Sequence, residues 1–346
     1  QRVRRDPLVF EALERMWPVL TPGELLIDLF GGRGLLRSAA EKVLGENWSL
    51  LYRERVADPA RMVFTGDDVP LLDEALEILG PRPKHRDDDL IRTYGHIVVD
   101  EAQDLSPMAL RMLDRRSLNG SMTVVGDMAQ ATGAWPHDDW ESLLEFLPDR
   151  RPPRREELTV GYRVPGPIMD LAARVLALAA PDLSPPTSIR HSGDAPEFVA
   201  VPRPEFGPAE TGHAVAAAVR REINEIGSGN VGVIVPDSMN EYLDESLTSE
   251  GLDHGGATRQ GLDHQVTIVP VSLAKGLELD SVIVVEPARI LSEGDRGAQS
   301  LYVALTRSTK RLVIVYSGEL PAVLAPAGAG SNGSTDGQLE LGFDQR

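Results

Sequence analysis

Residues 97–104, IVVDEAQD, place two adjacent acids directly after an apolar run. Such a run is typical of a β-strand buried on both faces of a parallel sheet, and the carboxyl ends of these strands open onto the crevice where ligands bind. There Asp100 is predicted to hold a hydrated Mg²⁺ and Glu101 to polarise an attacking water, which is the chemistry of nucleotide hydrolysis. The alternative is a strand ending in a solvated acidic turn, since acids are common in turns.

A second apolar run is followed by a neutral amide. Residues 122–132 read MTVVGDMAQAT, so a buried strand over 122–126 would lead to Gln130. An amide at this place can bond a γ-phosphate or its attacking water, and so report hydrolysis to the next domain. Taken alone, the segment also fits an ordinary turn.

An aromatic residue and an arginine stand side by side just before a predicted helix. Tyr162 can stack on a base, and Arg163 can stabilise charge on a transferring phosphoryl group. The alternative is a packed tyrosine beside a surface arginine.

Two later segments carry further polar residues of this kind. After an apolar strand, Gly276 permits close approach of the backbone to a ligand, and Glu278 is then placed to accept from a ribose hydroxyl. Residues 300–312 are predicted to form a helix with Arg307 at its end, where it would act as an arginine finger. A tight turn and a helix-capping arginine are the alternatives.

The elements that must position these residues alternate between strand and helix from residue 97 onward. Strands are predicted at 97–100, 122–126, 231–235, 266–271, 281–286 and 311–316, and helices at 106–115, 138–146, 167–179 and 211–226. This alternation predicts an α/β fold with largely parallel sheets.

A helical segment precedes this alternation, and a biased tail follows it. Residues 8–80 are predicted to be helical, with Thr21 and Glu24 forming a capping box at one helix start. The predicted domains are residues 1–155, which include the helical lead-in, and residues 156–320. Residues 321–346 are poor in large apolar groups and are expected to be a disordered tail.

Composition limits the class of protein and its partners. The 346 residues, 42% hydrophobic and 25% charged, are ordinary globular usage and suffice for two domains. Cysteine is absent, which excludes a disulfide framework and fits a reducing cytoplasm, and no apolar run approaches the ~20 residues that span a bilayer. The net charge of −18 disfavours DNA as a main partner and favours a basic protein surface.

The order of the motifs is more specific than any one of them. DEAQD, VVGDMAQ, LTVGYR, AKGLE and YVALTR follow one another as in superfamily 1 motors of the UvrD/Rep type, which the chain resembles over about 97–316. The resemblance implies two RecA-like P-loop NTPase domains with ATP and Mg²⁺ between them. The first would supply Asp100, Glu101 and Gln130, and the second Arg163 and Arg307. It also implies that Tyr162 stacks on adenine and that Glu278 contacts the ribose.

The chain departs from this pattern in three places. No Gly-x-x-x-x-Gly-Lys-Ser/Thr occurs, and the glycine run 31–34 lacks the Lys-Ser/Thr, so the phosphates have no cradle. We therefore expect the chain to be the C-terminal part of a longer motor and to be inactive alone. Ser272 stands where the family has histidine, which affects coupling to a nucleic-acid strand. Only about 100 residues separate Tyr162 from Thr267, too few for the large extra subdomain of strand-separating relatives.

The stretch 93–133, TYGHIVVDEAQDLSPMALRMLDRRSLNGSMTVVGDMAQATG, resembles HelD-like ATPases of actinobacteria, which associate with RNA polymerase; the missing insertion and the acidity agree with this resemblance. This resemblance implies a parent that binds RNA polymerase and uses ATP to release or recycle stalled enzyme. The rival interpretation is a fragment of a UvrD/Rep-type DNA repair helicase. Residues 338–343, QLELGF, also resemble a sliding-clamp-binding peptide, the alternative being a tail with no such partner.

Overall fold

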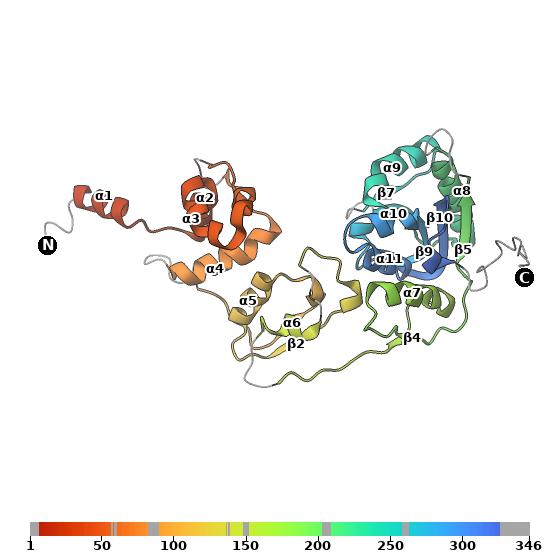
Figure 1. Cartoon of the computed structure of the whole chain (residues 1–346), viewed down its shortest axis with the longest axis horizontal. Coiled ribbons are helices and arrows are strands. Elements are labelled where there is room, and N and C mark those ends of the chain that lie inside the picture. Colours follow the sequence, from red (N-terminus) through yellow and green to blue (C-terminus); the bar gives the residue numbers. More distant parts are fainter. Residues whose placement is uncertain are drawn as a thin grey trace, which may run out of the picture. The chain divides into compact units, whose positions relative to one another are not determined.

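The computed structural model divides into two compact units, drawn in Figure 1. It describes residues 7–56, 58, 61–81, 90–135, 137, 139–147, 152–202, 209–257 and 263–325. Unit 1 comprises Gln1–Met128 and Gly133–Arg154, and unit 2 comprises Ala129–Thr132 and Arg155–Arg346. Among the described residues, no helix is both long and apolar enough to cross a bilayer. The proposed clamp-binding segment, residues 338–343, lies outside the described part.

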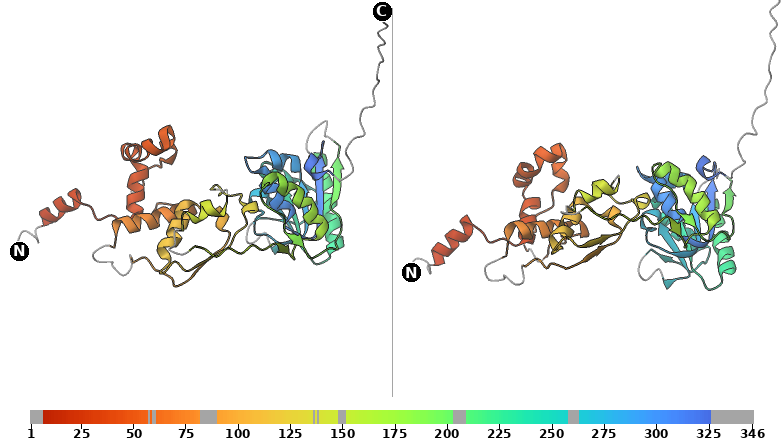
Figure 2. Two further views of the ribbon diagram at one scale, coloured as in Figure 1. Left: turned by 60° about the horizontal axis from the view of Figure 1, so that its bottom comes forward. Right: turned by 90° about the horizontal axis from the view of Figure 1, so that it is seen from below.

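Unit 1 begins with helices, as the sequence predicts. They are α1 (Pro7–Met16), α2 (Pro22–Gly31), α3 (Arg33–Leu44) and α4 (Val69–Leu79), with the 3-10 turns η2 (Gly45–Leu51) and η4 (Gly66–Asp68). The predicted capping box is confirmed: the Glu24 amide donates to Thr21 Oγ1 at 3.2 Å, and Glu24 Oε2 accepts from the Thr21 amide at 2.8 Å. Leu26, Phe30 and Leu36 form a small core with η2 and α4. Figure 2 gives two further views of the chain, with the N-terminal helices in red and orange.

A two-stranded parallel sheet follows in unit 1. β1 (Ile97–Val99) pairs with β2 (Met122–Val124) in the register Ile97↔Met122. Val99 packs with buried leucines of α5 (Pro107–Arg116) and α6 (Trp140–Leu144). The turns η5 (Ala102–Asp104) and η6 (Met128–Gln130) follow the two strands. The motif residues therefore lie in the turns that follow β1 and β2, and not on the faces of the sheet.

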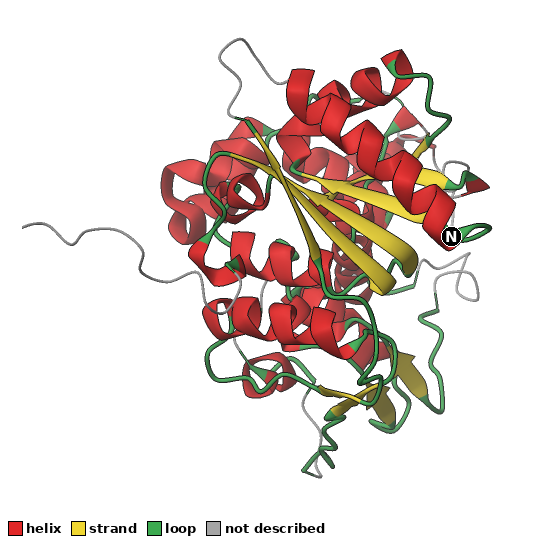
Figure 3. Ribbon diagram, turned by 90° about the vertical axis from the view of Figure 1, so that its right-hand side faces the viewer, coloured by secondary structure: helices red, strands yellow, loops and turns green. Residues whose placement is uncertain are grey.

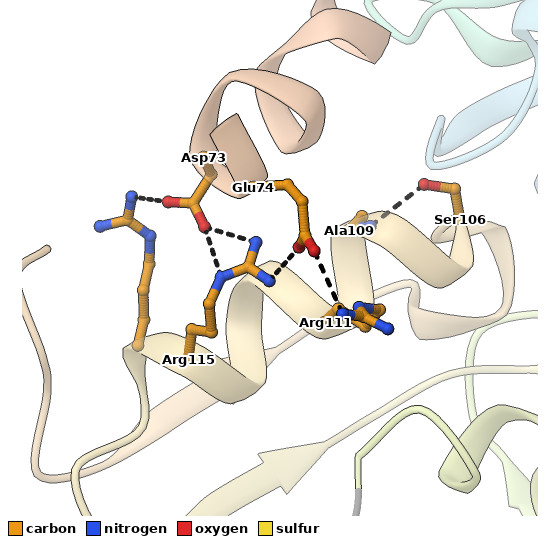
Figure 4. A network of polar contacts seen from close by, with 7 residues as sticks. Asp73, Glu74, Ser106, Ala109, Arg111 and Arg115 are labelled. Atoms are coloured by element: carbon orange, nitrogen blue, oxygen red, sulfur yellow. Dashed lines mark hydrogen bonds and ion pairs between the residues drawn. The ribbon is translucent and has the colours of Figure 1, made fainter. Parts of the chain in front are cut away.

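Ion pairs join α4 to α5 (Figure 4). Asp73 on α4 is buried and accepts from Arg115 Nε at 3.0 Å and Nη2 at 2.7 Å, and it also pairs with Arg116. Glu74 pairs with Arg115 and with Arg111, the latter at 3.2 Å. A buried carboxylate needs such partners to offset its desolvation, so this network binds the helical lead-in to the helix that follows β1.

Unit 2 is built on a six-stranded sheet in which every pairing is parallel, in the order β5-β10-β9-β6-β8-β7. The strands are β5 (Glu197–Val201), β6 (Val231–Val235), β7 (Gly255–Gly256), β8 (Val266–Pro270), β9 (Leu279–Val285) and β10 (Ser308–Ser317). The central strand β6 is a continuous apolar run, and β9 is apolar over 282–285, because both of their faces are covered. The predicted α/β class with parallel sheets is confirmed.

Helices cover both faces of this sheet (Figure 3). Side chains of α7 (Gly166–Ala179), α10 (Pro287–Ser292) and α11 (Gly297–Leu305) form one core with the sheet, and those of α8 (Ala209–Ile226) and α9 (Asn240–Ser249) form the other. Short elements complete the unit: β3 (Val160–Gly161), β4 (Thr187–Ser188), η7 (Asp237–Met239), η9 (Val271–Leu273) and η10 (Ala322–Leu324).

The structure differs from the sequence predictions in three details. The helix expected over 300–312 is α11, which ends at Leu305, because the chain turns there into β10 and the apolar residues after it enter the sheet. The strands β3, β4, β5 and β7 were not predicted. Leu324 is fully buried in the core around α7, so ordered structure continues into the segment expected to be a tail. No large insertion appears among the described residues between Tyr162 and Thr267.

Candidate functional site

The turn after β1 holds Glu101 in a left-handed backbone conformation. Glu101 has φ of 51°, one of two non-glycine residues with positive φ in the described part of the chain. Its amide donates to Asp100 Oδ1 at 2.9 Å, and Asp100 itself is exposed. A left-handed residue costs about 1–3 kcal/mol, and such residues cluster at functional sites. Hard carboxylate oxygens suit Mg²⁺, so Asp100 fits the role of a metal ligand through water.

Gln103 orients Glu101, and the sequence did not reveal this role. Its side chain is fully buried, donating from Nε2 to Glu101 Oε2 at 2.8 Å and accepting at Oε1 from the Asp127 amide at 3.0 Å. One amide thus links the exits of β1 and β2. Gly126 makes room for it, since a Cβ there would lie 2.4 Å from Gln103 Oε1. Its place inside the DEAQD motif was the one signal available.

Gln130 lies in unit 2, whereas the sequence placed it in the first domain. Its flanking residues Ala129 and Ala131 are buried, Ala129 within the core of unit 2. Its Oε1 accepts from Arg307 Nη2 at 3.0 Å, and its backbone carbonyl accepts from Lys275 Nζ at 3.0 Å. The packing of Ala129 in the core of unit 2 accompanies this placement, and sequence spacing does not reveal it.

Arg307 is held in the turn between α11 and β10. The residue is 4% exposed, and its Nε donates to the Val303 carbonyl at 3.1 Å. The guanidinium is thereby fixed by α11 and presented to the Gln130 amide. The structure brings together two residues that lie far apart in sequence and that were both predicted to act on the transferring phosphoryl group.

Arg163 and Glu278 form the second pair that the structure brings together. Arg163 Nη2 lies 2.5 Å from Glu278 Oε1, with both side chains about half exposed. Glu278 follows the turn at Gly276, whose φ of 77° favours glycine and where an added Cβ would meet open space. Tyr162 is 71% exposed.

The glycine run 31–34 serves helix packing. Gly31 ends α2, and a Cβ on it would lie 2.9 Å from Arg55 Cβ. Gly32 links α2 to α3, and a Cβ there would lie 2.9 Å from the Asp28 carbonyl oxygen. Both glycines therefore permit close packing at this corner.

Comparison with known proteins agrees with the class of protein that these residues indicate. Residues 231–316, from β6 to β10, match the family model described as viral superfamily 1 RNA helicase core domain. This part of unit 2 is therefore similar to a superfamily 1 helicase core domain. None of the curated proteins compared with the chain matches it.

Two solved structures of helicases are also similar to the chain. One is the C-terminal domain of a possible DNA helicase from Lactobacillus plantarum WCFS1, with a TM-score of 0.37 and 24% identity, covering 49% of this chain and 95% of that one. The other is arterivirus nonstructural protein 10 (helicase) in complex with DNA, with a TM-score of 0.33 and 17% identity, covering 66% of this chain. The chain spans 40% of that viral helicase.

Proposed function

We propose that the chain is the C-terminal motor portion of a superfamily 1 ATPase whose parent binds RNA polymerase and uses ATP to release or recycle stalled polymerase. The observation that carries the motor assignment is the contact of Gln130 with Arg307 in the same unit as the helicase-core match. An amide and an arginine that meet in this way form a unit able to sense and stabilise charge on a phosphoryl group.

The other residues take roles that their surroundings permit. Asp100 would hold Mg²⁺ through water, and Glu101, oriented by Gln103, would polarise the attacking water. Arg163 would share with Arg307 the stabilisation of developing charge, while Tyr162 would stack on adenine and Glu278 would accept from the ribose. Bound ATP and Mg²⁺ supply the phosphoryl group and its neutralisation.

Glu101 is the residue to change first. In the full-length parent, Glu101→Gln should lower kcat by about 10²–10⁴-fold, because an amide cannot act as a general base. RNA polymerase binding should persist in a pulldown with the same variant. Glu145→Gln, an exposed acid on unit 1, is the matched control and should leave kcat unchanged.

The same proposal requires a phosphate-binding loop that this chain does not contain. Residues 1–346 alone should therefore show negligible ATPase activity. Robust ATP turnover by residues 1–346 would contradict the proposal that their active site is incomplete. If RNA polymerase is absent from the proteins that co-purify with the parent, the proposal that RNA polymerase is its partner is wrong.

A DNA repair helicase fragment is the second candidate, because a helicase-core match also fits it. That candidate requires DNA binding that weakens steeply with salt. The net charge of −18 opposes it. A fluorescence anisotropy titration of the parent with single-stranded DNA at 50 and 200 mM salt distinguishes the two.

A further inference from the structure

Three basic side chains of unit 2 donate hydrogen bonds to carbonyl groups in the segment 129–132. Arg307 and Lys275 bind the side-chain and backbone carbonyls of Gln130, each at 3.0 Å. Arg296 Nη1 donates to the backbone carbonyl of Ala131 at 2.6 Å. Two of these contacts involve motif residues, whereas Arg296 belongs to none of the motifs.

Arg296 projects from a rigid support. It immediately precedes α11, and the next residue, Gly297, packs so closely on α10 that a Cβ would lie 2.2 Å from the Leu291 carbonyl oxygen. This close approach fixes the start of α11 on the end of α10. The backbone that carries Arg296 is therefore held at a packed corner.

We propose that Arg296 is a positioning residue for the Gln130–Arg307 pair. It holds the carbonyl of Ala131, the residue that follows Gln130. With Ala131 buried on one side and Arg296 bonded to its carbonyl, the Gln130 amide is kept within reach of Arg307. This inference rests on the proposed function of that pair, because it names the residue that holds the pair in position.

Displacement of the segment 129–132 should slow the chemical step strongly and weaken nucleotide binding little. A misplacement of about 1 Å in catalytic geometry can cost ~10²-fold in rate. Gln130 and Arg307 act on the phosphoryl group, whereas Tyr162 and Glu278 are assigned to the base and the ribose. Loss of Arg296 should therefore lower kcat and leave KM unchanged.

Hydrogen–deuterium exchange of residues 1–346 tests the structural step without any need for activity. In Arg296→Ala, the peptide covering 126–134 should exchange at least fivefold faster, while β9 is unchanged. Arg296→Lys, which keeps a donor, should recover part of the protection. Arg289→Ala, an exposed arginine on neighbouring α10, is the matched control and should change neither peptide. Unchanged exchange in 126–134, or equal acceleration throughout unit 2, would overturn the proposal.

Kinetics of the full-length parent test the catalytic step. Arg296→Ala should lower kcat by about tenfold at constant KM, with partial rescue by Arg296→Lys and no effect of Arg289→Ala. Faster exchange in 126–134 with unchanged kcat would overturn the positioning role. A wild-type parent without ATPase activity would instead refute the proposed function, and the exchange result would still decide whether Arg296 holds the segment.

Discussion

At the scale of single residues, a chain of hydrogen bonds controls the direction of Glu101. The strained backbone of Glu101 turns its carboxylate toward the buried amide of Gln103, which is fixed on its other side by the Asp127 amide. A catalytic acid or base is effective when its geometry is held before substrate arrives. Gln103 therefore holds the Glu101 carboxylate in place within this turn.

Gly126→Ala tests this chain of bonds. The added Cβ would meet Gln103 Oε1 at 2.4 Å and displace a fully buried side chain. We expect a loss of about 1–3 kcal/mol in the unfolding free energy of unit 1, measured by urea denaturation. Gly95→Ala is the matched control, because a Cβ there meets nothing within 4 Å and its φ is not positive. Equal effects of the two substitutions would contradict the steric role.

At the scale of elements, buried carboxylates connect helices to the segments around them. Asp68 precedes α4 and accepts from Arg53 Nη1 at 2.8 Å and Nη2 at 2.7 Å, and also from the Thr65 amide. The bond to Arg53 lowers the pKa of Asp68 from 3.8 to about 2, against the opposing effect of burial. The ionised form is thus stabilised in the folded protein.

This pKa sets a pH window for stability. Since the folded pKa lies below the unfolded one, the contribution of Asp68 is fully present above pH 3.8 and is lost as pH falls through about 2. The shift corresponds to about 2 kcal/mol. Urea denaturation should show Asp68→Asn to be less stable than wild type at pH 7, with the difference shrinking below pH 3.8. The neighbouring exposed Asp67→Asn should match wild type, and a constant difference at all pH values would contradict the assignment.

At the scale of the whole molecule, the two units have unequal cores. Unit 2 has two large cores, one on each face of its sheet, whereas unit 1 has two small separate clusters. Burial of apolar surface supplies most of the folding free energy. Unit 1 is therefore expected to be the less stable unit.

Calorimetry should resolve two transitions, with unit 1 melting first. Leu110→Ala should lower only the first transition and Ile283→Ala only the second, each by about 2–5 kcal/mol, because both side chains are fully buried in different units. A single transition that both substitutions shift would show that the units unfold together.

The sequence predicted the elements whose pattern is local. The capping box at Thr21 and the strand over 231–235 were expected from residue types and periodicity, and the structure has them. The short strands β3 and β7 escaped prediction because two residues carry no period. The end of α11 was misplaced because no glycine or proline marks the turn between the apolar runs 301–305 and 312–315.

By itself the sequence determined the chemistry available: paired acids, an amide and arginines at the ends of apolar runs, within an acidic, cysteine-free chain. Only the tertiary structure decided which of these groups meet. It joined Gln130 to Arg307, Arg163 to Glu278 and Glu101 to Gln103. Local pattern governs which element forms, but parallel pairing and the burial of small residues such as Ala129 and Ala131 govern which distant side chains come within hydrogen-bond distance.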